Sequence, residues 1–154
     1  MKITFKGDYA IKSLVFLSRR FEEDGGRYFQ LSEISKEQDI PVKFLEQIFL
    51  ILRKAGYLKS HRGAKGGFAL NRDPGAFTLG EIARLIEGPL SPIACVSHSS
   101  RQACDFERRC VLRPLWAEVR DAVNGIIDRV TFRDLAERER KLLREQAGPL
   151  MYYI

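Results

Sequence analysis

The segment from residue 31 to residue 70 constrains the fold more than any other part of the sequence. A short helix is predicted over residues 31–38, and Asp39-Ile40-Pro41 then makes a tight turn into a second helix that ends at Gly56. Proline suits the first turn of a helix because its missing N–H would be unpaired there anyway. Two helices joined by so short a turn are typical of a helix-turn-helix unit.

A glycine-rich hairpin follows the second helix directly. Short strand candidates at residues 57–61 and 68–70 flank the loop RGAKGG, residues 62–67, whose glycines permit the positive φ of a tight turn. Further helices are predicted over residues 8–21 and from Thr78 to Gly88, where Thr78 and Glu81 have the spacing of a capping box. Together these elements predict a winged helix-turn-helix.

The second half of the chain has a different organisation. Helical periodicity disappears between residues 89 and 110, and a heptad of apolar residues then follows at Leu112, Trp116, Val119, Val123, Ile126 and Val130. Such a seam is either a core stripe or the face by which two copies pair, and pairing is favoured because winged-helix proteins commonly bind two half-sites. A strongly charged last helix and an apolar tail complete the chain.

We therefore expect a mainly α fold with a small β wing and a long dimerisation helix. The predicted parts are a winged helix-turn-helix DNA-binding domain at 1–88, a cysteine-bearing loop at 89–110, the dimerisation and C-terminal helices at 111–147 and an apolar tail at 148–154. The sequence has neither a run of roughly 18 apolar residues nor a signal-peptide core, so a cytoplasmic protein without membrane contact is expected.

The net charge of +6 is concentrated around the predicted hairpin. No acidic residue lies between Glu46 and Asp73, whereas six basic residues do: Arg53, Lys54, Lys59, Arg62, Lys65 and Arg72. A cationic stretch of this kind suits a polyanion, because each cation that meets a phosphate releases condensed counterions. A solvated basic face is the alternative that charge alone leaves open.

Three cysteines follow the pattern C-x8-C-x5-C within the predicted loop: Cys95, Cys104 and Cys110. This spacing matches neither paired CxxC units nor a ferredoxin run. Soft thiolates gathered in one loop favour an iron-sulfur or zinc site, and the other interpretations are three small buried side chains or a metal-free thiol switch.

Four segments resemble a known bacterial family: MKITFKGDYA at 1–10, FLEQI at 44–48, RGAKGGF at 62–68 and EIARLIEG at 81–88. The sequence is similar to the IscR/NsrR/CymR family over roughly residues 1–135. This resemblance implies a dimeric winged-helix transcription factor that binds double-stranded DNA at a pseudo-palindromic operator. It also implies an iron-sulfur cluster, 2Fe-2S or 4Fe-4S, because many members hold one through three cysteines in the region of Cys95, Cys104 and Cys110.

The fourth cluster ligand differs between branches of this family. In the cluster-assembly regulator it is a histidine three residues after the last cysteine, but Arg113 stands there and cannot ligate. In the nitric-oxide-sensing branch it is an aspartate at the start of the first helix of the other subunit, and Asp8 matches that place. An acid at a helix N-terminus is also favoured by the helix dipole alone. His98 and Asp105 are weaker loop candidates.

The residues expected to contact DNA lie on the second helix of the helix-turn-helix and on the wing. Side chains near the N-terminus of a recognition helix reach base edges, which selects Lys43, Glu46 and Gln47. The resemblance implies that Glu46 selects the DNA sequence and that Arg62 enters the minor groove. The alternatives are that Glu46 is only an exposed helix charge and Arg62 only a cation in a turn. Phosphate contacts are expected from Lys59, His61 and Lys65.

The apolar chain end resembles a different branch, the cysteine-metabolism repressors that lack the cluster cysteines and pair with O-acetylserine sulfhydrylase. The alternative function is therefore a metal-free regulator of cysteine and sulfur metabolism, controlled by a partner enzyme that binds Ile154. A third hypothesis is an iron-sulfur carrier with an incidental basic face. An enzyme is not expected, because the sequence shows no nucleophile and base arrangement and no phosphate-binding loop.

Overall fold

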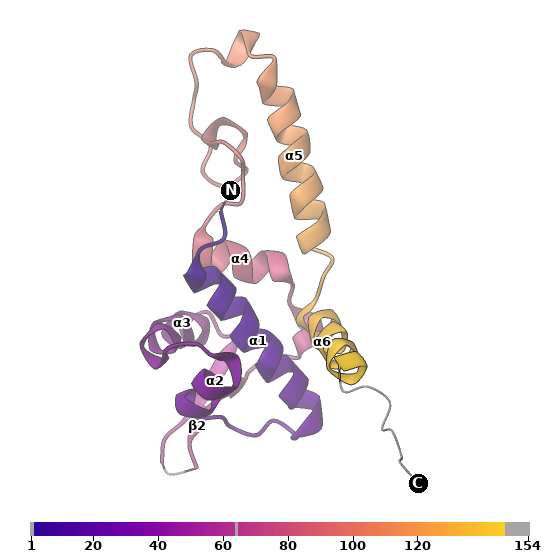
Figure 1. Ribbon diagram of the computed structural model, residues 1–154. Helices are drawn as coiled ribbons and strands as arrows, with labels where there is room; N and C mark the ends of the chain where they lie inside the picture. The colour runs from indigo at the N-terminus through magenta and orange to yellow at the C-terminus, as the bar shows by residue number, and fades with distance from the viewer. Residues whose placement is uncertain (1, 64, 147–154) are drawn as a thin grey trace.

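The computed structural model describes residues 2–63 and 65–146 (Figure 1). Within these residues it contains six α-helices, three 3-10 turns and one small antiparallel sheet. The elements are α1 (Phe5–Glu23), α2 (Leu31–Gln38), α3 (Val42–Lys54), β1 (Leu58–His61), β2 (Gly67–Leu70), η1 (Pro74–Ala76), α4 (Leu79–Glu87), η2 (Ala94–Val96), η3 (Glu107–Arg109), α5 (Leu112–Ile127) and α6 (Phe132–Gln146). The predicted fold class, mainly α with a β wing, is confirmed.

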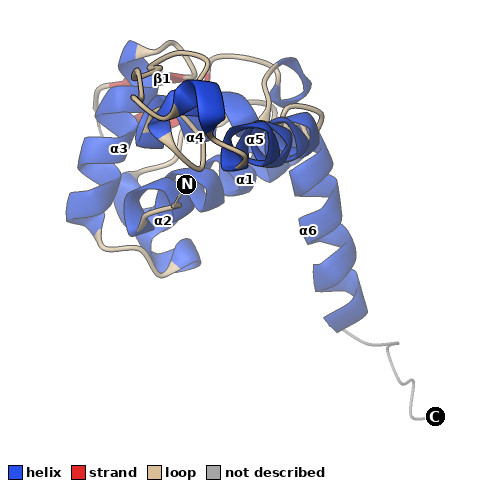
Figure 2. Ribbon diagram, turned by 90° about the horizontal axis from the view of Figure 1, so that it is seen from above, coloured by secondary structure: helices blue, strands red, loops and turns tan. Residues whose placement is uncertain are grey.

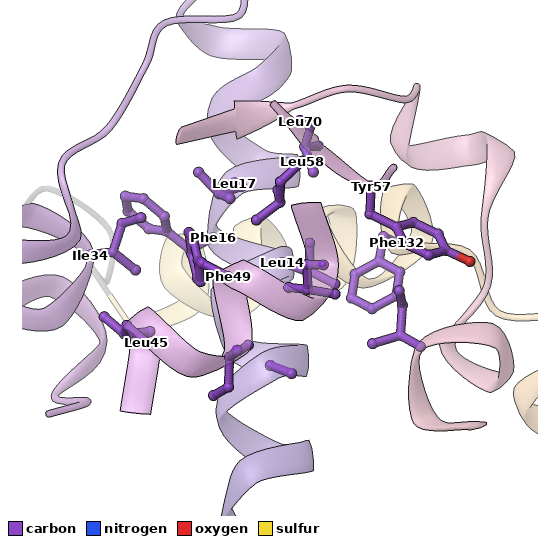
Figure 3. Packing of buried hydrophobic residues seen from close by; sticks show 14 of the residues in the cluster. Leu14, Phe16, Leu17, Ile34, Leu45, Phe49, Tyr57, Leu58, Leu70 and Phe132 are labelled. Carbon is purple, nitrogen blue, oxygen red and sulfur yellow. The ribbon is translucent and has the colours of Figure 1, made fainter. Parts of the chain in front are cut away.

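Helices α1 to α3 pack around one hydrophobic core. The inner face of α3 is completely buried through Leu45, Ile48, Phe49 and Leu52, as its periodicity predicts. Phe16 of α1 packs edge-on against Phe29, with 5.3 Å between the ring centroids. Figure 3 shows side chains from α1, α2, α3 and both strands meeting in this core. The outer face of α3 is thereby fixed in direction by the burial of the inner one.

The wing is a short hairpin that a third segment extends. Strands β1 and β2 pair from Leu58 with Leu70 to His61 with Gly67. Phe29, between α1 and α2, adds an antiparallel bridge to Phe68, because each backbone N–H donates to the carbonyl of the other at 2.9 and 2.8 Å. The base of the wing is therefore joined to the segment that leads into α2.

Helix α6 packs on α1 and shares its core. Phe132 is fully buried and stacks on Phe77 with 4.9 Å between ring centroids. Arg140 of α6 pairs with Glu22 of α1 at 2.8 Å, and Arg19 pairs with Glu139 at 3.1 Å. The sequence grouped α6 with the dimerisation helix, whereas these contacts join it to the same body as the wing.

Helix α5 rises from this body with little cover (Figure 1), and α6 projects from the body in a different direction (Figure 2). None of the residues of α5 is buried, and Leu112, Leu115 and Ile126 of this helix are each at least half exposed. The last position of the predicted heptad, Val130, lies just after the helix ends at Ile127. In the described part of the chain, no helix is long and apolar enough to cross a membrane.

Candidate nucleic-acid interface and cysteine segment

The outer face of α3 carries the three residues predicted to read bases. Lys43, Glu46 and Gln47 are all exposed, and their spacing of three and four residues puts them on one side of the helix. Phe44 is also 45% exposed there, and its ring packs edge-on against Tyr9 of α1 at 5.6 Å. The sequence prediction did not single out Phe44, because an apolar residue next to the core residue Leu45 carries no separate signal for an exposed position.

The wing exposes cations to solvent both at the tip of its hairpin and along strand β1. Arg62 and Lys65 are exposed at the tip of the hairpin, and Lys59 is exposed on β1. The tip is tight, since a Cβ on Gly66 would overlap the backbone of His61 and approach the carbonyl oxygen of Gly63 to 2.9 Å. Gly66 is thus required by the close approach of the backbone, whereas Gly63 is required by its φ of +111°.

Tyr28 is a further residue at the base of the wing that sequence reasoning did not single out. The Lys59 ammonium lies 5.8 Å from the centre of the Tyr28 ring, and the His61 ring lies 5.7 Å from it. Arg53 of α3 donates a hydrogen bond to Ser60 Oγ of β1 at 3.2 Å. These contacts hold the cationic side of β1 next to the recognition helix.

Arg72, counted in the cationic stretch by the sequence analysis, has a structural position. Its side chain donates to the carbonyl oxygens of Gly56 and Ala55 at 3.2 and 3.3 Å, and its guanidinium lies 4.5 Å from the centre of the Tyr57 ring. The last carbonyls of a helix need such donors, so Arg72 completes the C-terminus of α3. The candidate nucleic-acid face therefore consists of the outer side of α3 and the wing.

The three cysteines lie in the connection between α4 and α5, which we call the cysteine segment (residues 89–110). Cys95 and Cys110 are half-buried, Cys104 is exposed, and all three are free thiols. Among the residues described, no group of three His, Cys, Asp or Glu side chains lies close enough together to hold a metal ion. The donor chemistry fits a soft metal centre, but one copy of the chain does not assemble its ligands in this structure.

Charged side chains tie the cysteine segment to α5. Arg120 donates to the Val96 carbonyl oxygen at 2.5 Å and to Asp121 at 2.8 Å. The hydrogen bond from Arg120 lowers the pKa of the Asp121 carboxyl, which keeps it ionised. Arg113, at the position where one family branch has a histidine ligand, pairs with Glu107 at 2.9 Å.

The other proposed ligands are dispersed. Asp8 lies in the first turn of α1 and pairs with Lys12 at 2.7 Å. His98 lies 3.4 Å from Asp121, and Asp105 is exposed. The start of α1 is nevertheless anchored near the cysteine segment, because the Thr4 N–H and hydroxyl both donate to Glu87 at the end of α4. The chain end at Ile154 lies outside the described residues.

Comparison with known proteins agrees with this geometry. Residues 3–138 match the family model Rrf2, described as an iron-dependent transcriptional regulator. A putative rrf2-like HTH-type regulator of Rhodobacter capsulatus is 38% identical over 136 residues (86% of this chain, 91% of the relative), and the HTH-type regulator CymR of Bacillus subtilis is 35% identical over 136 residues (88% and 90%). An IscR of Enterobacter sp. is 29% identical over 142 residues (92% and 83%).

Solved structures give the same result. The global cysteine regulator CymR of B. subtilis superposes with a TM-score of 0.73 at 34% identity, covering 90% of this chain and 98% of its own. IscR of T. potens superposes with a TM-score of 0.72 at 30% identity, covering 92% of this chain and 90% of its own. The expected resemblance is confirmed, and the relatives are regulators rather than enzymes. This chain belongs to the Rrf2 family of winged-helix transcriptional regulators.

Proposed function

We propose that this chain forms a homodimer that binds a pseudo-palindromic operator, and that an iron-sulfur cluster at Cys95, Cys104 and Cys110 modulates its operator affinity. The observation that carries the DNA-binding part is the exposed outer face of α3 beside an acid-free wing, both fixed by a fully buried core. Such a face presents side chains to base edges while the wing cations meet the sugar-phosphate backbone.

Glu46 gives this interface its sequence preference in our proposal. An acid on a face that meets polyphosphate is unfavourable unless it reads a base, and a glutamate accepts a hydrogen bond from cytosine N4. Gln47 pairs with adenine, Lys43 with guanine, and Arg62 inserts into a narrow minor groove. Lys59 and Lys65 bind phosphates, which position the protein without reading sequence.

The dimer is supported by the exposed apolar seam of α5. Two seam positions, Leu112 and Ile126, are 51% and 60% exposed, and Leu115 beside the seam is 50% exposed. Soluble proteins rarely leave such apolar patches uncovered unless another surface binds there. A second copy would cover the seam by the same residues, which is the rule for a two-fold interface. Two recognition helices related in this way would enter successive major grooves.

The cluster is supported by the donor set and by the family description as iron-dependent. Cys95, Cys104 and Cys110 would hold it, and Asp8 of the other subunit is the proposed fourth ligand. When bound, an iron-sulfur cluster supplies a redox-sensitive centre that small molecules can attack. The chain's own part is to join that segment to α5 through Arg120, while Glu87, at the end of α4 just before the segment, holds Thr4 at the start of α1.

The alternative proposal is a metal-free regulator of cysteine and sulfur metabolism that a partner enzyme such as O-acetylserine sulfhydrylase controls through Ile154. It is favoured by the similarity to CymR, whose structure is titled the global cysteine regulator of B. subtilis. Removing residues 151–154 should then abolish binding of the enzyme and leave DNA binding unchanged.

One purification separates the two proposals. The protein is prepared anaerobically, its iron and acid-labile sulfide are counted, and its visible spectrum is compared with that of the variant with Cys95, Cys104 and Cys110 all changed to Ser. Cluster binding predicts iron and sulfide in the wild type alone. Equal iron content and equal operator affinity in both proteins would overturn the cluster proposal.

Operator recognition is tested on DNA selected from a random pool at a stated salt concentration. Arg62→Ala should weaken the selected site by about 1–3 kcal/mol relative to a scrambled one. Arg138→Ala, which removes an equal charge from the exposed side of α6, is the matched control and should change neither affinity. Equal, weak binding of the wild type to every DNA would overturn the DNA-binding proposal.

A further inference from the structure

Arg84, near the end of α4, contacts the last part of α5 in a forked manner. Its Nη2 donates to Asp128 Oδ1 at 2.5 Å and its Nη1 donates to Asn124 Oδ1 at 3.1 Å. Asn124 lies in the last turn of α5 and Asp128, four residues on, caps its C-terminus, so the two lie one above the other on the same side of the helix. Because the guanidinium is planar and rigid, holding two points on one helix restrains the direction of the helix as well as its position.

The start of α4 is shaped to receive the same end of α5. A Cβ on Gly80 would overlap Asp128 Oδ1, so glycine makes room for this carboxylate. The Leu79 N–H donates to the Val130 carbonyl oxygen at 2.8 Å, and Thr78 forms a bridge with Thr131. Helix α4 therefore contacts the base of α5 at both of its own ends.

These polar contacts matter because hydrophobic burial does not fix α5. None of the residues of α5 is buried in the described chain, whereas α3 has four fully buried residues. The direction of α5 relative to the winged body therefore depends on contacts at its base and on Arg120 farther along. Arg84 lies on α4, which packs on α1, and its side chain holds the end of α5 at two points.

The direction of α5 has a large effect at the DNA. A helix of 16 residues is about 24 Å long. A tilt of about 10° over a lever of that length moves its far end by about 4 Å, which exceeds the 3.4 Å rise of one base pair. In a dimer joined through α5, the tilt of each body changes the separation of the two recognition helices by a similar amount.

We propose that Arg84 is a positioning residue that sets the operator half-site spacing this regulator accepts. This inference rests on the proposed function, since it requires a dimer paired through α5 and two DNA-bound recognition helices. Arg84 itself contacts neither the DNA nor the partner in this proposal. It acts by holding Asn124 and Asp128, and through them the angle between α5 and the winged body.

The test is a series of operators whose half-sites are moved apart in steps of one base pair. Arg84→Met should reduce the preference for the best spacing about three- to ten-fold, while its affinity for DNA with one half-site and its dimer dissociation constant stay those of the wild type. Arg84→Lys should give an intermediate preference, because an ammonium group cannot hold both partners in a fork. Melting temperatures should change little, since the Arg84 and Asp128 side chains are 36% and 43% exposed.

Arg129→Met is the matched control. Arg129 is exposed on the same turn, and its Nε donates to the Gly125 carbonyl oxygen within α5. It should keep the wild-type spacing preference. The proposal is overturned if Arg84→Met also keeps that preference, or if it loses dimerisation or half-site affinity and so acts through folding. A wild type with no preferred operator would overturn the proposed function and this inference with it.

Discussion

Two glycines of the wing differ in what surrounds them, and this difference gives a quantitative prediction. Gly63 has φ +111° and Gly67 has φ +144°, both in the region that side chains rarely adopt. A Cβ at Gly63 would have no atom within 4 Å. A Cβ at Gly67 would lie 2.5 Å from the carbonyl carbon of Phe29 and 3.0 Å from the nitrogen of Gln30.

The two alanine substitutions should therefore have unequal costs. Gly63→Ala adds backbone strain alone, about 1–2 kcal/mol. Gly67→Ala adds the same strain and also pushes apart the Phe29–Phe68 bridge, whose two hydrogen bonds contribute about 1 kcal/mol each. We expect Gly67→Ala to lower the free energy of unfolding by about 3–4 kcal/mol.

Urea unfolding of both variants under one set of conditions measures this difference. At urea concentrations where both variants are still folded, Gly67→Ala should also lose operator affinity, because the wing separates from the segment before α2. Gly63→Ala should lose much less. If the two substitutions cost the same free energy, the close approach of Phe29 does not matter, and the reasoning from the backbone contact is refuted.

Further predictions concern the core, the cations and one carboxylate. Phe132→Ala should lower the free energy of unfolding by about 3–5 kcal/mol and Tm by about 10 °C, because the ring is fully buried; calorimetry measures both. Lys59→Met should reduce the slope of log affinity against log salt by about 0.9, whereas Arg72→Met should leave the slope unchanged and lower stability, because Arg72 binds helix carbonyls. Hydrogen bonds from Thr131 lower the pKa of Asp134, so its stabilising effect is present above the ordinary aspartate pKa of about 3.9 and is lost as pH falls through the folded-state value. In urea unfolding over a pH series, Asp134→Asn should accordingly be less stable than the wild type at pH 7, and this difference should shrink below about pH 4.

The parts of the fold that local sequence determines were predictable. The bounds of α2 match the prediction at residues 31–38, because the start and the stop signals both lie within a few residues of the helix. The wing was predictable for the same reason, since its glycines and flanking strands are contiguous. The capping box at Thr78 and Glu81 is confirmed by a hydrogen bond from the Thr78 N–H to Glu81 at 2.6 Å.

Features that depend on distant residues were not predictable. Helix α1 begins at Phe5 rather than near Asp8, because Thr4 caps it and is itself held by Glu87. The charges of α6 pair with those of α1, and periodicity cannot identify that partner. The cysteine spacing gave no distances either, because a segment without helical or strand periodicity has no fixed rise per residue.

The difference in burial between α3 and α5 indicates how a signal in the cysteine segment would reach DNA. Shifting α3 within its body would disturb the packing of four fully buried side chains. Complete loss of the packing of one such side chain lowers the free energy of unfolding by about 2–5 kcal/mol. Allosteric coupling typically supplies only about 1–3 kcal/mol. Reorienting α5, which has no buried residue and a partly exposed ion pair at its base, lies within that range. In the proposed dimer, operator affinity would therefore change by movement of two intact winged bodies relative to each other, with each recognition helix kept in its place.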